Sequence, residues 1–164
     1  MNTAADARAT DMKAKPTIAI GCDDAGIVMK NAMVAHLEGL GHEIADLSAR
    51  EDEDYPDVAE RVAVYVAEGR YDRGILVCGT GIGMAIAANK VPGIRAAQIP
   101  DPYSAERARK SNDAQIACFG NRTMGTEMAL VCLDHWLDSD FAGGSSAPKV
   151  EKIKRVEFRH LHAA

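Results

Sequence analysis

Residues 73–89, which read RGILVCGTGIGMAIAAN, constrain the fold of this chain more than any other stretch. The apolar run at 74–77 predicts a buried strand that ends in Cys78, a turn with three glycines follows, and residues 84–89 predict a helix start. Glycines let a backbone approach a ligand closely, and free N–H groups at a helix start attract an anion. The same groups would favour the thiolate of Cys78, which is its reactive form. The stretch therefore predicts an α/β protein with an anion site and a reactive thiol at its rim.

The rest of the chain repeats this alternation of strand and helix. Apolar runs bounded by glycines and polar loops predict strands at 17–22, 42–47, 74–77, 93–97 or 93–99, and 114–119. Helical spacing predicts helices at 27–40, 56–69, 84–89, 101–110 and 126–137. Such repeats indicate a five-stranded parallel sheet with helices on both faces. Ligands bind at the carboxyl ends of these strands, so a strand order of 2-1-3-4-5 would bring Asp23, Asp24 and Cys78 into one cleft.

The length of 164 residues suits one domain, which we place at residues 16–140. Residues 1–15 contain no apolar stretch and are expected to be a disordered lead-in rather than a secretory signal. Residues 141–164 form a small-residue linker followed by a helix with partly apolar spacing from 149 to 159. We expect this helix to pack on a partner subunit; the alternative is that it packs on its own domain.

Composition excludes several classes of function. A net charge of −5 argues against a sequence-independent nucleic-acid binder, and no apolar run is long enough to cross a membrane. The cysteines form no C-x-x-C pair and the histidines show no ligand spacing outside the C-terminal tail, so we expect no metal. Nothing points to export, so reduced thiols and a cytoplasmic location are expected.

Five motifs together resemble one family, the type B ribose-5-phosphate isomerases and the galactose-6-phosphate isomerase subunits. The motifs are IAIGCDDAG (18–26), DYPD (54–57), DRGILVCGTGIGMAIAANKVPGIRAA (72–97), YSAERARKSNDAQ (103–115) and GNRTMG (120–125). The resemblance spans residues 17–155 and implies a Rossmann-like αβα sandwich with an extra C-terminal helix. It further implies a homodimer or homotetramer with shared active sites. The implied reaction interconverts an aldose phosphate and a ketose phosphate through an enediolate, without a metal or organic cofactor.

The resemblance also assigns roles to individual residues. Cys78 falls on the base that moves the proton, and Thr80 and the backbone N–H groups that follow it fall on the hole for the enediolate oxygens. Asp23 and Tyr55 fall on contacts to substrate hydroxyls, and Arg122 falls on a phosphate ligand. The full set of predicted substrate-binding residues is Asp23, Asp24, Tyr55, Gly79, Gly81, Ile82, Gly83, Asp101, Asn112, Arg122 and Lys149.

Three positions depart from the family pattern as we interpret it: Asp24 and Pro100 each replace a histidine, and Ser145 replaces an arginine. A carboxylate about 5 Å from a phosphate costs roughly 3 kcal/mol per unit charge at an effective dielectric near 20, so Asp24 indicates a rebuilt phosphate pocket. Proline cannot shuttle a proton, so Pro100 indicates that another group opens the sugar ring or that the substrate is already open-chain. We therefore expect an atypical substrate, such as a tetrose phosphate or another sugar.

Two other functions stay open at this stage. The first alternative is a non-catalytic or regulatory subunit of an isomerase assembly. The second is a flavodoxin-like module that binds a nucleotide or flavin. The intact residues around Cys78 argue against the first alternative. The aromatic content of 5% offers few rings for stacking on a flavin and argues against the second.

Overall fold

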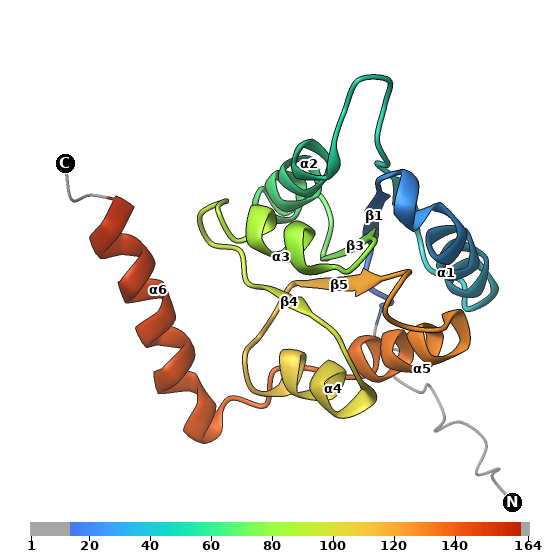
Figure 1. Cartoon of the computed structure of the whole chain (residues 1–164). Helices are drawn as coiled ribbons and strands as arrows, with labels where there is room; N and C mark the ends of the chain where they lie inside the picture. Colours follow the sequence, from blue (N-terminus) through green and yellow to red (C-terminus); the bar gives the residue numbers. More distant parts are fainter. Residues whose placement is uncertain (1–13, 162–164) are drawn as a thin grey trace, which may run out of the picture.

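A computed structural model describes residues 14–161 as a parallel sheet between two layers of helices (Figure 1). The sheet has five strands in the order β2-β1-β3-β5-β4. The strands are β1 (Ile18–Cys22), β2 (Ile44–Asp46), β3 (Arg73–Cys78), β4 (Ala96–Gln98) and β5 (Ile116–Gly120). The helices are α1 (Ile27–Gly39), α2 (Tyr55–Ala67), α3 (Ile82–Ala88), α4 (Pro102–Lys110), α5 (Thr126–Leu137) and α6 (Ala147–Leu161), with 3-10 turns η1 (Asp24–Gly26) and η2 (Gly144–Ser146). The predicted αβα sandwich with an extra C-terminal helix is confirmed, whereas most of the expected lead-in lies outside the described residues.

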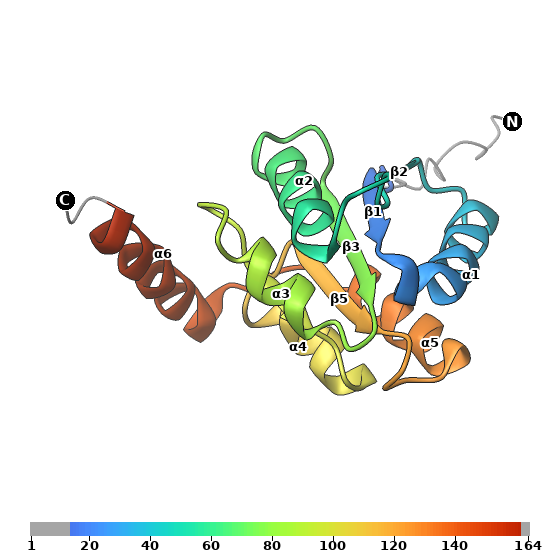
Figure 2. The ribbon, with the colours of Figure 1, turned by 45° about the horizontal axis from the view of Figure 1, so that its top comes forward.

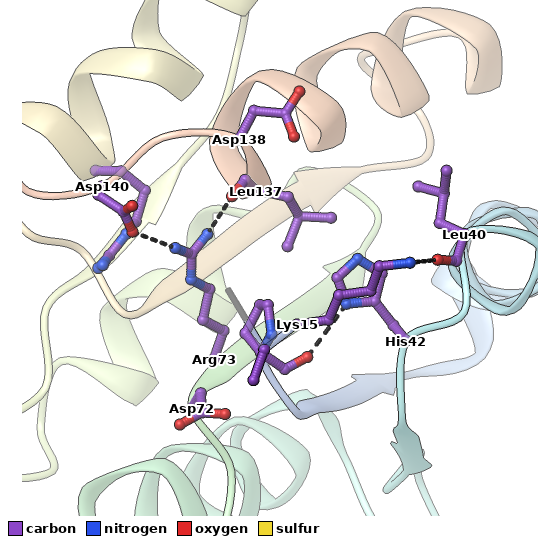
Figure 3. A pocket seen from close by; sticks show the side chains of 11 residues that line it. Lys15, Leu40, His42, Asp72, Arg73, Leu137, Asp138 and Asp140 are labelled. Atoms are coloured by element: carbon purple, nitrogen blue, oxygen red, sulfur yellow. Dashed lines mark hydrogen bonds and ion pairs between the residues drawn. The ribbon is translucent and has the colours of Figure 1, made fainter. Parts of the chain in front are cut away.

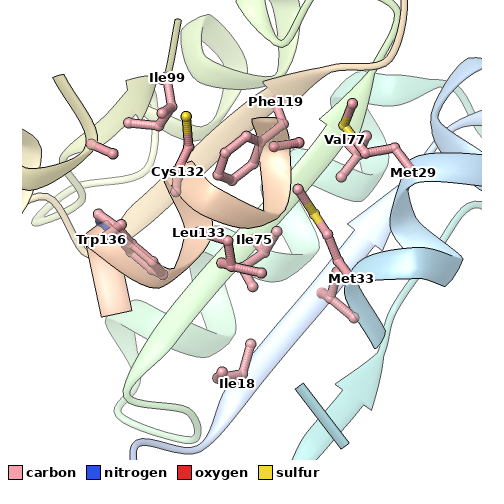
Figure 4. Close-up of a cluster of buried hydrophobic side chains, with 14 of the residues drawn as sticks. Ile18, Met29, Met33, Ile75, Val77, Ile99, Phe119, Cys132, Leu133 and Trp136 are labelled. Atoms are coloured by element: carbon pink, nitrogen blue, oxygen red, sulfur yellow. The ribbon is translucent and has the colours of Figure 1, made fainter. Parts of the chain in front are cut away.

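Two hydrophobic clusters hold the layers together. Helices α1, α4 and α5 cover one face of the sheet, and α2 and α3 cover the other (Figure 2). Figure 4 shows the first cluster, to which β5 contributes Phe119, α5 contributes Trp136 and α1 contributes Met33. Strands β1, β3 and β5 are buried along their whole length, as expected for parallel strands that are covered on both faces.

The strand order differs from the expected 2-1-3-4-5 at its last two positions. Strand β5 pairs with β3 in the interior, and β4 pairs only with β5 and forms the edge. The physical reason lies in the two segments: β5 is wholly buried, whereas β4 has three residues, all only half-buried. A short, partly exposed strand is suited to an edge, and the fully apolar strand takes the interior position.

Helix α6 lies at the end of the molecule away from the carboxyl ends of β3 and β5 (Figures 1 and 2). Its contacts with the domain include the carboxylate of Glu157, which accepts the Gly93 N–H at 2.9 and 3.0 Å. Four apolar side chains along the helix are about half exposed or more: Ile153, Val156, Phe158 and Leu161. None of the described helices is long and apolar enough to cross a membrane.

Candidate active site

Three loops meet at the carboxyl edge of the sheet, one after each of the neighbouring strands β1, β3 and β5. The register aligns Cys22 of β1 with Val77, and Cys78 of β3 with Gly120 of β5. The three loops therefore begin at nearly the same level of the sheet. This is where ligands bind in open parallel sheets, because strand order and direction leave a crevice there.

Cys78 is the last residue of the central strand and is 6% exposed. Its Sγ atom accepts a hydrogen bond from the N–H of Gly81 at 3.1 Å. Gly81 has a φ of 74°, a left-handed conformation that glycine adopts without strain. This hydrogen bond and the burial of the side chain fix the position of the sulfur at the end of the central strand.

The turn after Cys78 is pressed directly onto β5. A Cβ atom at Gly120 would lie 2.6 Å from the carbonyl carbon of Thr80, so only glycine permits this approach. The Thr80 hydroxyl oxygen accepts the Ile82 N–H at 3.3 Å, and its carbonyl accepts the side-chain amide of Gln98 at 3.4 Å. Thr80 is exposed, and these two hydrogen bonds hold its hydroxyl and its carbonyl two residues after Cys78.

Tyr55 is brought to the same turn from the start of α2. A Cβ atom at Gly83 would lie 2.6 Å from Cε2 of Tyr55, which places the ring directly against this glycine. Helix α2 is fixed there by a capping box in which Asp54 and Asp57 exchange side-chain and backbone hydrogen bonds. The Tyr55 side chain is 42% exposed and forms one wall beside the glycine turn.

The loop after β5 runs along the residues that follow β3. The Asn121 N–H donates to the Cys78 carbonyl and the Arg122 N–H donates to the Gly79 carbonyl, both at 2.9 Å. The Arg122 side chain passes over Gly79, since a Cβ atom there would lie 3.5 Å from its Cδ. Arg122 is exposed and forms no salt bridge with any acid in residues 14–161. An unpaired guanidinium over Gly79, the residue that follows Cys78, is suited to hold an anionic group in a bidentate manner.

The loop after β1 carries the two aspartates. Asp23 caps η1 by accepting the Gly26 N–H at 3.2 Å, and Asp24 is exposed. Both line a cavity of about 300 Å³ together with Lys30 and Ser48. The Lys30 ammonium is already engaged by Asp46 at 2.6 Å.

Asp46 adds a further negative charge next to this cavity. Burial raises the pKa of its carboxyl, but hydrogen bonds from Lys30 and Ser48 outweigh burial and leave the pKa below its ordinary value. Two carboxylates thus line the cavity, a third lies beside it, and the one cation in its wall is already paired, so the local electrostatics favour sugar hydroxyls over a phosphate.

Three predicted site residues are engaged or placed elsewhere in the single chain. The Asp101 carboxylate caps α4 by accepting the N–H and hydroxyl of Ser104 at 2.8 and 2.7 Å, and these bonds lower its pKa. Asn112 precedes β5, and its carbonyl accepts a hydrogen bond from Arg95 near the start of β4. Lys149 is exposed in the first turn of α6. Asn112 and Lys149 thus belong to the end of the sheet opposite Cys78.

A cavity of about 710 Å³ lies away from Cys78, at the amino ends of the strands (Figure 3). Its buried cation is Arg73, whose guanidinium donates to the carbonyls of Trp136, Leu137 and Ser139 at 3.1, 2.9 and 3.0 Å. Burial lowers the pKa of Arg73 to about 10, so it stays charged at neutral pH. Sequence reasoning did not identify this residue, which closes the end of α5 and serves the fold. No group of three or more potential metal ligands occurs among residues 14–161.

The fold and the site define a doubly wound α/β protein with a hydrogen-bonded thiol at the end of its central strand. The family model described as Ribose/Galactose Isomerase matches residues 18–153. Ribose-5-P isomerase B of Listeria innocua is 53% identical over 142 residues, covering 85% of this chain and 96% of that protein. D-erythrulose-4-phosphate isomerase of Pectobacterium atrosepticum is 51% identical over 149 residues, covering 89% and 98%. The solved structure of Clostridium thermocellum ribose-5-phosphate isomerase B superposes with a TM-score of 0.85 at 43% identity, covering 88% and 99%. The chain belongs to the ribose/galactose isomerase family.

Proposed function

We propose that this protein is an aldose–ketose isomerase that acts on a sugar phosphate and uses Cys78 as its base. The observation that supports this most directly is the position of the Cys78 sulfur, which accepts the Gly81 N–H beside the unpaired guanidinium of Arg122. Relatives that this chain matches over nearly their whole length carry the names of sugar-phosphate isomerases. The proposed proton transfer uses groups of the protein alone and needs no additional cofactor.

The proposed reaction moves one proton between two neighbouring carbons of the substrate. The Cys78 thiolate removes a proton from the carbon beside the carbonyl, which leaves an enediolate, and then returns a proton to the other carbon. A second proton passes between the two substrate oxygens, so no external oxidant or reductant is needed. Thr80 and the backbone N–H of Gly83 are proposed to stabilise the enediolate oxygens, and Arg122 to bind the phosphate.

We propose a tetrose 4-phosphate as the substrate. The acidic cavity around Asp24 favours hydroxyl groups on that side of the site. The phosphate of a tetrose 4-phosphate occupies the oxygen that would close a furanose ring, so the sugar is open-chain and needs no ring-opening group. The names of the relatives do not decide between substrates, since one at 53% identity is named for ribose 5-phosphate and one at 51% for D-erythrulose 4-phosphate.

We also propose that a second subunit completes the site and that the protein works in the cytoplasm. Asn112 and Lys149 lie at the end of their own domain opposite Cys78. They could therefore contact a substrate only in the active site of a partner subunit. The exposed apolar side chains of α6, with Phe158 at 64% exposure, are suited to pack on that partner. A homodimer or homotetramer with shared active sites accounts for both features.

The test is an isomerase assay with the purified protein over a panel of tetrose, pentose and hexose phosphates and the corresponding free sugars. We expect the highest kcat/KM on erythrulose 4-phosphate and its aldose, and a large loss of activity in Cys78→Ser. Cys132→Ala is the matched control, because Cys132 lies in α5 within the cluster on the other face of the sheet. Efficient turnover of ribose 5-phosphate with little activity on tetroses would contradict the substrate. Turnover only after addition of a homologous chain would favour a regulatory subunit instead.

A further inference from the structure

We propose that Asn121 is a positioning residue, which holds the turn carrying Asp23 and Asp24 at a fixed place relative to Cys78. The proposal rests on the proposed function and adds a residue that the isomerase reaction requires without any direct contact to the reacting atoms.

Asn121 bonds to both halves of the site at once. Its backbone N–H donates to the carbonyl of Cys78 at 2.9 Å. Its side-chain amide donates to the carbonyl of Ala25 at 2.8 Å, across 96 positions of the sequence. Ala25 lies within η1, directly after the two aspartates. One residue therefore connects the strand end that bears the thiol with the loop that bears the carboxylates.

Among residues 14–161, the Asn121 amide makes the only side-chain hydrogen bond between η1 and the loop after β5. Asp23 bonds within its own turn to Gly26, and the backbone of Cys22 bonds to Ser48 and Ala49 on the side of β2. The backbone ladder of β1 with β3 ends at the pair Cys22–Val77, and beyond it the turn meets β3 through a packing contact, in which Gly26 lies directly against the carbonyl of Val77. Packing stops the turn from moving inward, and the Asn121 amide stops it from moving outward.

This arrangement predicts a larger effect on catalysis than on folding. Asn121 is half-buried, and loss of one hydrogen bond between uncharged groups costs about 1 kcal/mol of stability, while small misplacements of substrate-positioning groups can lower a rate many-fold. A purely structural Asn121 would lower stability and leave kcat per folded molecule unchanged.

The experiment compares Asn121→Ala with Ser139→Ala, a control that removes one side-chain hydrogen bond of 2.7 Å at the opposite edge of the sheet. We expect kcat on the best substrate to fall about tenfold in Asn121→Ala and to stay within twofold in Ser139→Ala, with similar small losses of stability. A double-mutant cycle with Asp23→Asn distinguishes positioning from a local effect. If Asn121 acts through Asp23, the two losses of activity are less than additive.

Amide hydrogen exchange provides a readout that does not need turnover. The Gly26 N–H, which bonds to Asp23, is expected to exchange several-fold faster in Asn121→Ala and at the wild-type rate in Ser139→Ala. Unchanged exchange, unchanged kcat or fully additive losses would each overturn the role of Asn121. A wild-type protein without turnover on any sugar phosphate would instead refute the proposed function, and hydrogen exchange would still decide whether Asn121 holds the turn.

Discussion

The contact between Gly26 and β3 provides a sharp test of how the site is held together. Gly26 has φ −95° and ψ −8°, which is not the left-handed region, so Gly26→Ala tests the close packing of this residue rather than a need for positive φ. The new Cβ atom would lie 2.4 Å from the carbonyl oxygen of Val77 and 2.9 Å from Cβ of Cys22. Carbon and oxygen need roughly 3.3 Å, so the turn has to retreat by about 1 Å.

A retreat of about 1 Å moves Asp23 and Asp24 away from Cys78. Misplacement on this scale can cost on the order of 100-fold in rate, and overpacking of this kind costs about 1–3 kcal/mol of stability. We therefore expect kcat/KM of Gly26→Ala to fall about 100-fold while the protein stays folded at 25 °C.

The assay is steady-state isomerisation on the best substrate, normalised to the folded fraction from urea denaturation. Gly39→Ala is the matched control, because Gly39 lies in α1 and a Cβ atom there meets nothing within 4 Å. This variant should keep its activity and gain up to about 1 kcal/mol of stability. Wild-type kcat/KM in folded Gly26→Ala would refute the claim that the spacing of this turn sets the rate.

Three further predictions concern stability and assembly. Arg73→Met leaves three buried carbonyls at the end of α5 without their donor and should lower the free energy of unfolding by about 3–5 kcal/mol; a loss below about 1 kcal/mol in urea denaturation would contradict this. The lowered pKa of Asp46 means that its charged form stabilises the fold above the unfolded pKa of about 4, and that this contribution is lost as pH falls through the folded pKa. The stability advantage of wild type over Asp46→Asn should thus shrink between pH 7 and pH 3, and a constant difference would count against the ion pair with Lys30. If α6 joins subunits as proposed, the full chain should run as an oligomer in size-exclusion chromatography with light scattering and a chain without residues 141–164 as a monomer; the same number of subunits in both would disprove the role of α6 in assembly.

Local features of the site could be predicted from the sequence. The apolar run before Cys78 and the glycines after it predict a strand end and a tight turn, and the structure has both. The helix begins at Ile82 rather than at 84, because Gly81 in its left-handed conformation already serves as the N-cap. These features depend on neighbouring residues, so the pattern of one stretch suffices to predict them.

Features that depend on distant partners were missed. The order of strands along the chain does not say which become neighbours, and the interior place of β5 follows from its complete burial against both layers. The sequence indicates only a loop residue at Asn121, because its hydrogen-bond partner Ala25 is 96 positions away. The sequence indicates that Arg73 is the polar boundary of a strand. In the structure it is buried under the end of α5, whose residues lie more than 60 positions further along the chain. The signal that might have revealed Arg73 is a charge that directly precedes a fully apolar run.

The most direct test of the central claim is solvent deuterium incorporation into the substrate in D₂O, followed by NMR on erythrulose 4-phosphate. A proton that passes through Cys78 exchanges with solvent, so wild type should label the carbon beside the carbonyl and isomerise the sugar. Cys78→Ala should lose both activities by about 10²–10⁴-fold, the usual contribution of a general base, while remaining folded. Labelling and isomerisation within about twofold of wild type in Cys78→Ala would show that another group removes the proton.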